Sequence, residues 1–308
     1  MYTYGPVPSR RLGRSLGVSP IPPKTCSYSC VYCQLGKTKH LQVERKSFYA
    51  KEDILTEIIK RAMVSQSDYI TFVGDGEPTL CKDLGWLIHQ TKAELRLPVA
   101  VITNGSLLFL KDVRRDLKEA DVVLPTFDAG SEKTFRHINR PHGDIGFNTM
   151  VGGLIDFRAE FSGQIWLEVM LVNGLNDSEE ELWKIRKTVD LIKPDRVYVV
   201  TPIRPPAETW VEPSSPETIL KAQQILGNAE PITEPEMGEF GLREFKDARQ
   251  AIIEIGSRHP LRREQALEIE NAFSSPGTVE KLSNENKLVN VNFKGKEYLL
   301  PGYFIRGK

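Results

Sequence analysis

The chain has 308 residues, a formal net charge of zero, 40% hydrophobic residues and 27% charged residues, which is the balance of an ordinary globular protein. Its length allows one large domain, with or without a second domain of about half that size. No apolar run reaches the roughly 18 residues that span a bilayer, and the first residues lack the apolar core of a signal peptide. We therefore expect a monomeric cytoplasmic protein that does not bind membranes and whose four cysteines stay reduced.

Positive charge is concentrated at the N-terminus. Residues 1–50 carry eight lysines and arginines against one glutamate, a net charge of +7, so the remaining 258 residues sum to −7. Such a segment favours an anionic partner such as phosphate or RNA, although a solvated surface arm has the same composition. Arg10, Arg11 and Arg14 are the candidates for phosphate contacts.

Short apolar runs alternate with amphipathic segments along the first two thirds of the chain. The predicted strands cover 16–21, 68–74, 99–104, 121–127, 164–172 and 196–203. The predicted helices cover 51–63, 83–94, 110–120, 131–138, 147–160 and 178–192. This alternation predicts an α/β fold with a parallel sheet, closed by right-handed crossovers into an open or partial barrel.

Polar, glycine-rich segments follow five of these strands: "GDGEPTL", "TNGSL", "PTFDAG", "VNGLND" and "TPIRPPAE". Turn formation alone accounts for any one of them. Five in succession favour a cavity lined by the carboxyl ends of the strands, where parallel sheets place their functional residues.

The end of the chain differs in pattern. Residues 227–241 are rich in proline and glutamate, which predicts a linker after a first domain at 1–226. Helices at 242–255, 261–273 and 276–286 and a hairpin at 288–301 predict a small winged-helix-like domain at 242–308. Its twelve basic and nine acidic residues give about +3. Such domains contact nucleic acids or dock onto proteins, and both uses stay open.

Three of the four cysteines, Cys26, Cys30 and Cys33, lie within eight positions in "CSYSCVYC". Thiolates select zinc, copper(I) or iron–sulfur clusters. A structural zinc site needs a fourth ligand, for which the chain offers Cys81, about fifty residues away, or His40. Three thiolates on one tight loop suit a [4Fe–4S] cluster with one iron left open for a substrate. The zinc alternative stays open.

"CSYSCVYC" resembles the cluster loop of the radical S-adenosylmethionine (SAM) superfamily. The resemblance covers about residues 1–210 and implies a partial (β/α)6 barrel of radical SAM type. It also implies one [4Fe–4S] cluster on Cys26, Cys30 and Cys33, with SAM bound at the open iron. Such enzymes cleave SAM reductively to a 5′-deoxyadenosyl radical, with an external electron donor of the flavodoxin or ferredoxin type.

The resemblance further implies which residues contact SAM. They lie beside the last cysteine and at successive strand ends: Tyr32, Gly74, Gly76, Glu77, Thr103, Asn104, Asp128, Asn139, Arg140, Glu168, Ile203 and Arg204. Other roles are open for three of them. Asp128 could cap the following helix, Arg140 could pair with a surface acid, and Glu168 would need a partner if it points inward.

Within the superfamily, "GEPTL", "TNG", "FDA" and "INRPH" are similar to a group related to the wyosine-forming tRNA enzymes. The chain has no cysteines for a second cluster, so we expect it to carry a single cluster. The resulting hypothesis is hydrogen abstraction from an anionic substrate, with tRNA base modification as its leading form. The alternatives are an activase-type enzyme acting on a partner protein, and a non-enzymatic protein that binds zinc and nucleic acid.

Overall fold

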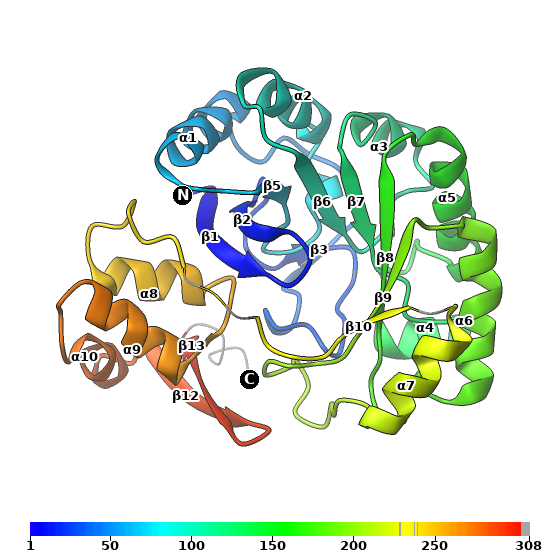
Figure 1. The fold of residues 1–308 in the computed structure, drawn as a ribbon. Coiled ribbons are helices and arrows are strands. Elements are labelled where there is room, and N and C mark those ends of the chain that lie inside the picture. Colours follow the sequence, from blue (N-terminus) through cyan, green and yellow to red (C-terminus); the bar gives the residue numbers. More distant parts are fainter. Residues whose placement is uncertain (228, 237, 239, 303–308) are drawn as a thin grey trace.

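The computed structural model describes residues 1–227, 229–236, 238 and 240–302. Within them, eight strands form one curled sheet in the order β1-β2-β5-β6-β7-β8-β9-β10. Helices pack along its outer side, and a small C-terminal module stands next to β1 (Figure 1). None of the helices in these residues is both long and apolar enough to cross a membrane.

The predicted partial barrel of parallel strands is confirmed. They are β2 (Gly13–Val18), β5 (Tyr69–Phe72), β6 (Val99–Thr103), β7 (Val122–Pro125), β8 (Gln164–Met170) and β9 (Arg196–Val200). The helices between them are α1 (Lys51–Val64), α2 (Leu84–Glu94), α3 (Lys111–Asp116), α4 (Glu132–Ile138), α5 (Phe147–Glu160) and α6 (Glu179–Ile192).

Two edge strands and one helix were not expected from the sequence. Strand β1 (Thr3–Ser9) pairs antiparallel with β2, and its two prolines are tolerated because it is an edge strand. Strand β10 (Glu230–Ile232) pairs with β9 inside the predicted linker 227–241, of which residues 228, 237 and 239 lie outside the described part. Helix α7 (Pro216–Ile225) begins at a Ser215 cap. The sheet therefore extends one strand further on each side.

The C-terminal module, residues 240–302, contains the predicted helices and hairpin. Its elements are α8 (Ala248–Gly256), β11 (Leu261–Arg262), α9 (Arg263–Ala272), α10 (Thr278–Asn284), β12 (Leu288–Phe293) and β13 (Lys296–Pro301). Helix α8 starts six residues later than predicted, because Asp247 caps it by accepting a hydrogen bond from the backbone of Gln250 at 2.8 Å. Helix α10 starts after Gly277 rather than at Pro276.

The module shares its hydrophobic core with the barrel edge. Tyr4 and Val7 of β1 pack in one cluster with Phe240, Phe245 and Ile252, and all five side chains are buried. Burial of apolar area of this kind is the main favourable term in folding. The edge strand and the module thus form one continuous body, and the module occupies a fixed place beside the barrel opening.

Two adjacent glycines of α5 provide a test of the helix packing against the barrel. A Cβ at Gly153 would lie 2.3 Å from the Phe109 backbone nitrogen, whereas a Cβ at Gly152 would meet nothing within 4 Å. We expect Gly153→Ala to lower the free energy of unfolding by about 1–3 kcal/mol, and Gly152→Ala to raise it by up to about 1 kcal/mol through helix propensity. Urea unfolding measures both, and equal effects of the two substitutions would contradict this packing.

Candidate active site

The three clustered cysteines lie on the segment that follows β2. Cys26 ends the short strand β3 (Thr25–Cys26), which pairs with β4 (His40–Leu41). All three thiols are free and partly exposed, whereas Cys81 is buried in the barrel core. In the described part of the chain, no three His, Cys, Asp or Glu side chains are arranged to hold a metal ion. A zinc ion needs all its ligands to converge on one point. A [4Fe–4S] cluster instead binds each cysteine at a separate iron, so its thiolates lie further apart.

Two side-chain amides donate hydrogen bonds toward the cysteine sulfurs. Asn104 Nδ2 lies 3.5 Å from Cys26 Sγ, and Asn139 Nδ2 lies 3.7 Å from Cys30 Sγ. Burial raises the pKa of Cys26 to about 12 and also raises the pKa values of Cys30 and Cys33. A bound metal would keep such thiols deprotonated, and N–H donors at sulfur are what iron–sulfur clusters receive from their surroundings. The donor set therefore fits an iron–sulfur cluster.

The segment after β5 is attached to the start of the cysteine loop. The backbone N–H of Lys24 donates to the backbone carbonyl of Asp75 at 2.6 Å, and the backbone N–H of Glu77 donates to the backbone carbonyl of Thr25 at 3.1 Å. A Cβ at Gly76 would lie 1.7 Å from that Thr25 oxygen, so only glycine fits there. Gly74 is less restricted, since its Cβ would lie 3.0 Å from an Ile21 methyl group. These contacts hold the loop against the end of β5.

Glu77 connects the ends of two neighbouring strands. Its Oε1 accepts hydrogen bonds from the Thr79 nitrogen at 3.0 Å, the Thr79 hydroxyl at 2.5 Å and the Thr103 hydroxyl at 2.6 Å. Its Oε2 accepts one from the Asn104 nitrogen at 2.7 Å. Burial raises the pKa of this carboxyl, and the hydrogen bonds offset part of that rise. The same side chain thus places Asn104, whose amide reaches Cys26.

Asp128 occupies the corresponding position between the cysteine loop and β8. It accepts hydrogen bonds from the Tyr32 hydroxyl at 2.5 Å, from Asn139 Nδ2 at 2.8 Å and from the Met170 nitrogen at 2.8 Å. Burial raises its pKa to about 6. It does not cap α4, because Ser131 does so. The structure therefore brings together three of the predicted SAM contacts, Tyr32, Asp128 and Asn139, beside Cys30.

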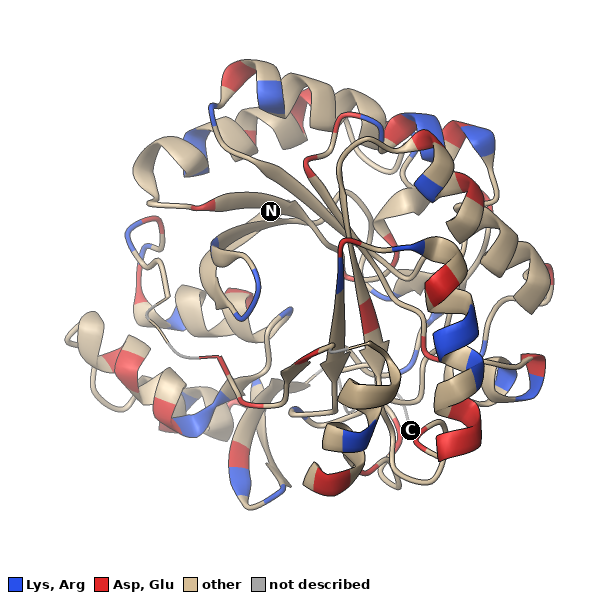
Figure 2. Ribbon diagram, turned by 45° about the vertical axis from the view of Figure 1, so that its right-hand side comes forward, with Lys and Arg blue, Asp and Glu red and all other residues tan. Residues whose placement is uncertain are grey.

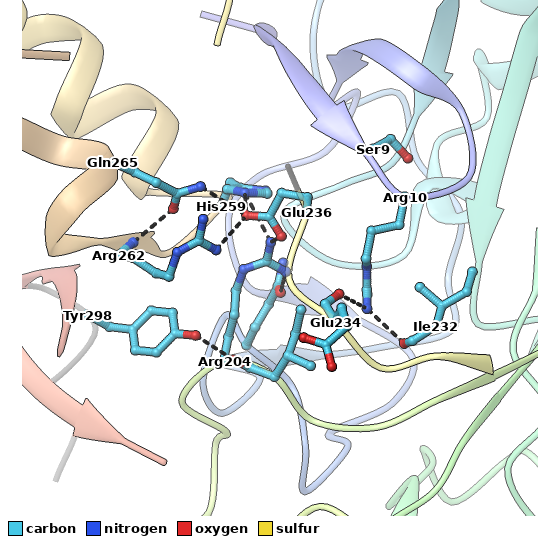
Figure 3. Close-up of polar contacts among 12 residues, drawn as sticks. Ser9, Arg10, Arg204, Ile232, Glu234, Glu236, His259, Arg262, Gln265 and Tyr298 are labelled. Carbon is cyan, nitrogen blue, oxygen red and sulfur yellow. Dashed lines mark hydrogen bonds and ion pairs between the residues drawn. The ribbon is translucent and has the colours of Figure 1, made fainter. Parts of the chain in front are cut away.

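The remaining predicted SAM contacts have protein partners of their own. Arg140 pairs with Glu208 at 2.5 Å, and Glu168, which is buried, pairs with Arg11. The Ile203 carbonyl accepts a hydrogen bond from the Tyr298 hydroxyl at 2.6 Å. Arg204 donates to Glu236 at 2.5 Å and, like His259 and Arg262, converges on that carboxylate (Figure 3).

The three arginines proposed for phosphate contacts do not share one surface. Arg10 donates to the Ile232 carbonyl at 2.9 Å, and Arg11 pairs with Glu168 inside the barrel. Arg14 is half exposed and pairs with Asp68. Two of the three therefore point into the molecule.

A cavity of about 280 Å³ lies inside the curled sheet. Tyr32 and Gln34 of the cysteine loop line this cavity, and so do Arg10 and Arg11 of the β1–β2 turn. The C-terminal module adds Arg258 and His259. Sequence reasoning missed these module residues because no local motif marks them, and only the packing of the module on β1 brings them to the barrel.

Comparison with known proteins identifies the family. A family model described as the radical SAM superfamily matches residues 21–185, more than half of the chain. A UPF0026 protein of Methanocaldococcus jannaschii is 37% identical over 99% of this chain and 97% of its own length. A protein of Brachyspira hyodysenteriae called GTPase Obg is 43% identical over 78% of this chain, but the chain spans only 38% of that protein.

A solved structure shows the same fold at low sequence identity. The structure of TYW1 with a lysine–pyruvate adduct bound is 17% identical, with a TM-score of 0.53 over 70% of this chain and 74% of that chain. The similarity concerns the fold, which in this chain is the curled eight-stranded sheet with the cysteine loop after β2. Together with the family match, these findings establish that the chain belongs to the radical SAM superfamily.

Proposed function

We propose that this protein is an enzyme that cleaves SAM reductively at a [4Fe–4S] cluster and abstracts hydrogen from an anionic substrate. The observation that carries the proposal is the loop with three free thiols, two of which receive amide N–H donors at sulfur. The cluster would supply the electron that splits the sulfonium of SAM, received from an external flavodoxin- or ferredoxin-type donor. Membership of the superfamily supports this chemistry.

The residues of the chain would bind and orient the reactants. Cys26, Cys30 and Cys33 hold the cluster in this proposal, and Asn104 and Asn139 direct their amides to it. Two groups of the proposed SAM contacts are joined by direct hydrogen bonds. Tyr32, Asp128 and Asn139 lie beside Cys30, and Glu77 accepts from Thr103 and Asn104.

The cysteine loop provides the first test. After anaerobic reconstitution, we expect the native protein to bind about four irons and to form 5′-deoxyadenosine from SAM and dithionite. Cys30→Ala should lose the iron and the product. Cys81→Ala is the matched control, because this thiol lies in the apolar core rather than on the loop, and it should retain both. A colourless native protein that holds zinc would contradict the proposal and support the non-enzymatic alternative.

Glu77 provides a second test, of the support under the loop. In Glu77→Gln, an amide group must face hydrogen-bond donors on at least one side, because both carboxylate oxygens accept. We expect the free energy of unfolding to fall by about 1–3 kcal/mol and the iron content to fall with it. Glu94→Gln, at an exposed position near the end of α2, should change neither quantity. Identical urea midpoints and iron contents for the two variants would refute this role.

Transfer RNA is a more specific candidate for the anionic substrate. The basic N-terminal segment favours it. The expected winged-helix-like character of the C-terminal module favours it too, and the order α8-β11-α9-α10-β12-β13 supports that expectation. The segments "GEPTL" and "INRPH" support it as well, because the group that they resemble is related to the wyosine-forming tRNA enzymes. However, basic and acidic positions are interspersed along the outer helices (Figure 2).

Assays with separate RNA and protein fractions of a cell extract distinguish tRNA from a partner protein as the substrate. If tRNA is the substrate, purified tRNA should raise the yield of 5′-deoxyadenosine, and its retention by the protein should weaken by more than about tenfold between 50 and 200 mM salt. If the activase-type alternative holds, the protein fraction should raise the yield instead. A yield that neither fraction changes would exclude both macromolecules as the substrate.

A further inference from the structure

The barrel cavity is lined by an excess of positive charge. Among the described residues, four arginines line it against two carboxylates: Arg10, Arg11, Arg204, Arg258, Glu168 and Glu236. Arginine is the side chain best suited to planar recognition of carboxylate and phosphate groups. Even when Asp75, which pairs with Arg258 at 3.1 Å, is included, one positive charge remains.

Arg10 accounts for that remaining charge. Each of the other three arginines has a carboxylate partner, whereas Arg10 donates to the backbone carbonyls of Ile232 at 2.9 Å and Glu234 at 3.4 Å. Figure 3 shows its side chain extended from the β1–β2 turn toward these two residues. Within the described part of the chain, Arg10 forms no ion pair.

The neighbouring Arg11 is incompletely satisfied. Its Nη1 pairs with Glu168, but its Nε is buried and has no hydrogen-bond partner among the described residues. A buried charged donor without an acceptor is costly. Burial, followed by the charges of Arg11 and Arg204, lowers the pKa of Arg10 to about 10. An oxyanion placed against both side chains would offset this repulsion and could accept from them.

The two arginines and the cysteine loop leave opposite ends of β2. They precede β2, whereas the cysteine loop follows it, and the six residues of β2 span about 20 Å. Of the residues proposed above to contact SAM, Tyr32, Glu168 and Arg204 line this cavity, whereas Glu77, Asn104 and Asp128 do not. A molecule anchored at the arginines would therefore extend along the cavity toward Tyr32.

We propose that Arg10 and Arg11 bind the carboxylate or phosphate group of a small-molecule substrate inside the barrel. This rests on the proposed function and names the substrate class for the same site. A cavity of about 280 Å³ accommodates one small molecule. A polymer is disfavoured because the arginines belong to the wall of this cavity: Arg10 reaches across to the end of β10, and the C-terminal module covers the β1 edge.

Direct binding of simple anions tests the site without turnover. We would titrate the anaerobically reconstituted full-length protein with inorganic phosphate and with malonate, at constant ionic strength set by chloride, using calorimetry. We expect saturable binding of one equivalent of at least one anion. A preference for phosphate indicates a phosphorylated substrate, and a preference for malonate indicates a carboxylic acid.

The variants assign that binding to the two arginines. Arg10→Gln should weaken it at least tenfold, and so should the double variant Arg11→Gln/Glu168→Gln, which leaves no unpaired buried carboxylate. Arg136→Gln, which removes an exposed arginine paired with Glu132 on α4, is the control and should bind as the native protein does. No saturable binding up to 10 mM, about the limit for a specific weak site, or unchanged binding by both cavity variants, would overturn the proposal.

A turnover assay tests the same site with natural compounds. An anionic extract fraction below about 1 kDa should raise the yield of 5′-deoxyadenosine several-fold for the native protein and Arg136→Gln, but not for Arg10→Gln. Stimulation by the RNA or protein fraction alone would overturn the proposal. Anion binding that depends on Arg10, in a protein that never cleaves SAM, would refute the proposed function and leave the anion site supported.

Discussion

A curled but open β-sheet has two free edges, and the opening between them exposes its inner face to water unless other segments cover it. The way this opening is covered determines the rest of the molecule. On one side, Tyr4 and Val7 of β1 pack into the core of the C-terminal module. Across the opening, Arg10 of the β1–β2 turn donates to Ile232 at the end of β10. The cavity walls therefore come from three segments that are distant in sequence, and the C-terminal module contributes Arg258 and His259 to them.

The polar part of this closure centres on Glu236. It is buried and accepts hydrogen bonds from Arg204 at 2.5 Å and His259 at 2.9 Å (Figure 3). Burial raises the pKa of Glu236, but the hydrogen bond from His259 and the charge of Arg204 outweigh burial and hold it well below its usual range. Burial and Arg204 lower the pKa of His259 to about 4, which favours the neutral form of the ring at its contact with Glu236. Buried charges arranged in this way add little net stability, because the cost of removing them from water offsets their attraction, but the loss of one partner leaves a buried charge unpaired.

The sequence predicts those parts of the fold that carry a local pattern. The six inner strands are apolar runs, and the cysteines are close neighbours, so both can be recognised without the structure. Strands β1 and β10 could not be predicted, because prolines interrupt them and edge strands lack the pattern of buried ones. The fit of Gly76 against Thr25, like the pairing of Arg11 with Glu168, joins residues far apart in the chain, and no local pattern reports such contacts.

The basic N-terminal segment shows why net charge along a sequence is an incomplete guide to partners. Arg45 is buried and pairs with Asp112 and Asp116 at 2.5 Å, and Arg10 and Arg11 point into the barrel. Three of the eight basic residues in this segment therefore act inside the molecule. An electrostatic field that attracts nucleic acid requires charges at the surface. Because Arg10 and Arg11 line a cavity instead, part of the charge that suggests a polyanion in the sequence supports recognition of a single small anion in the structure.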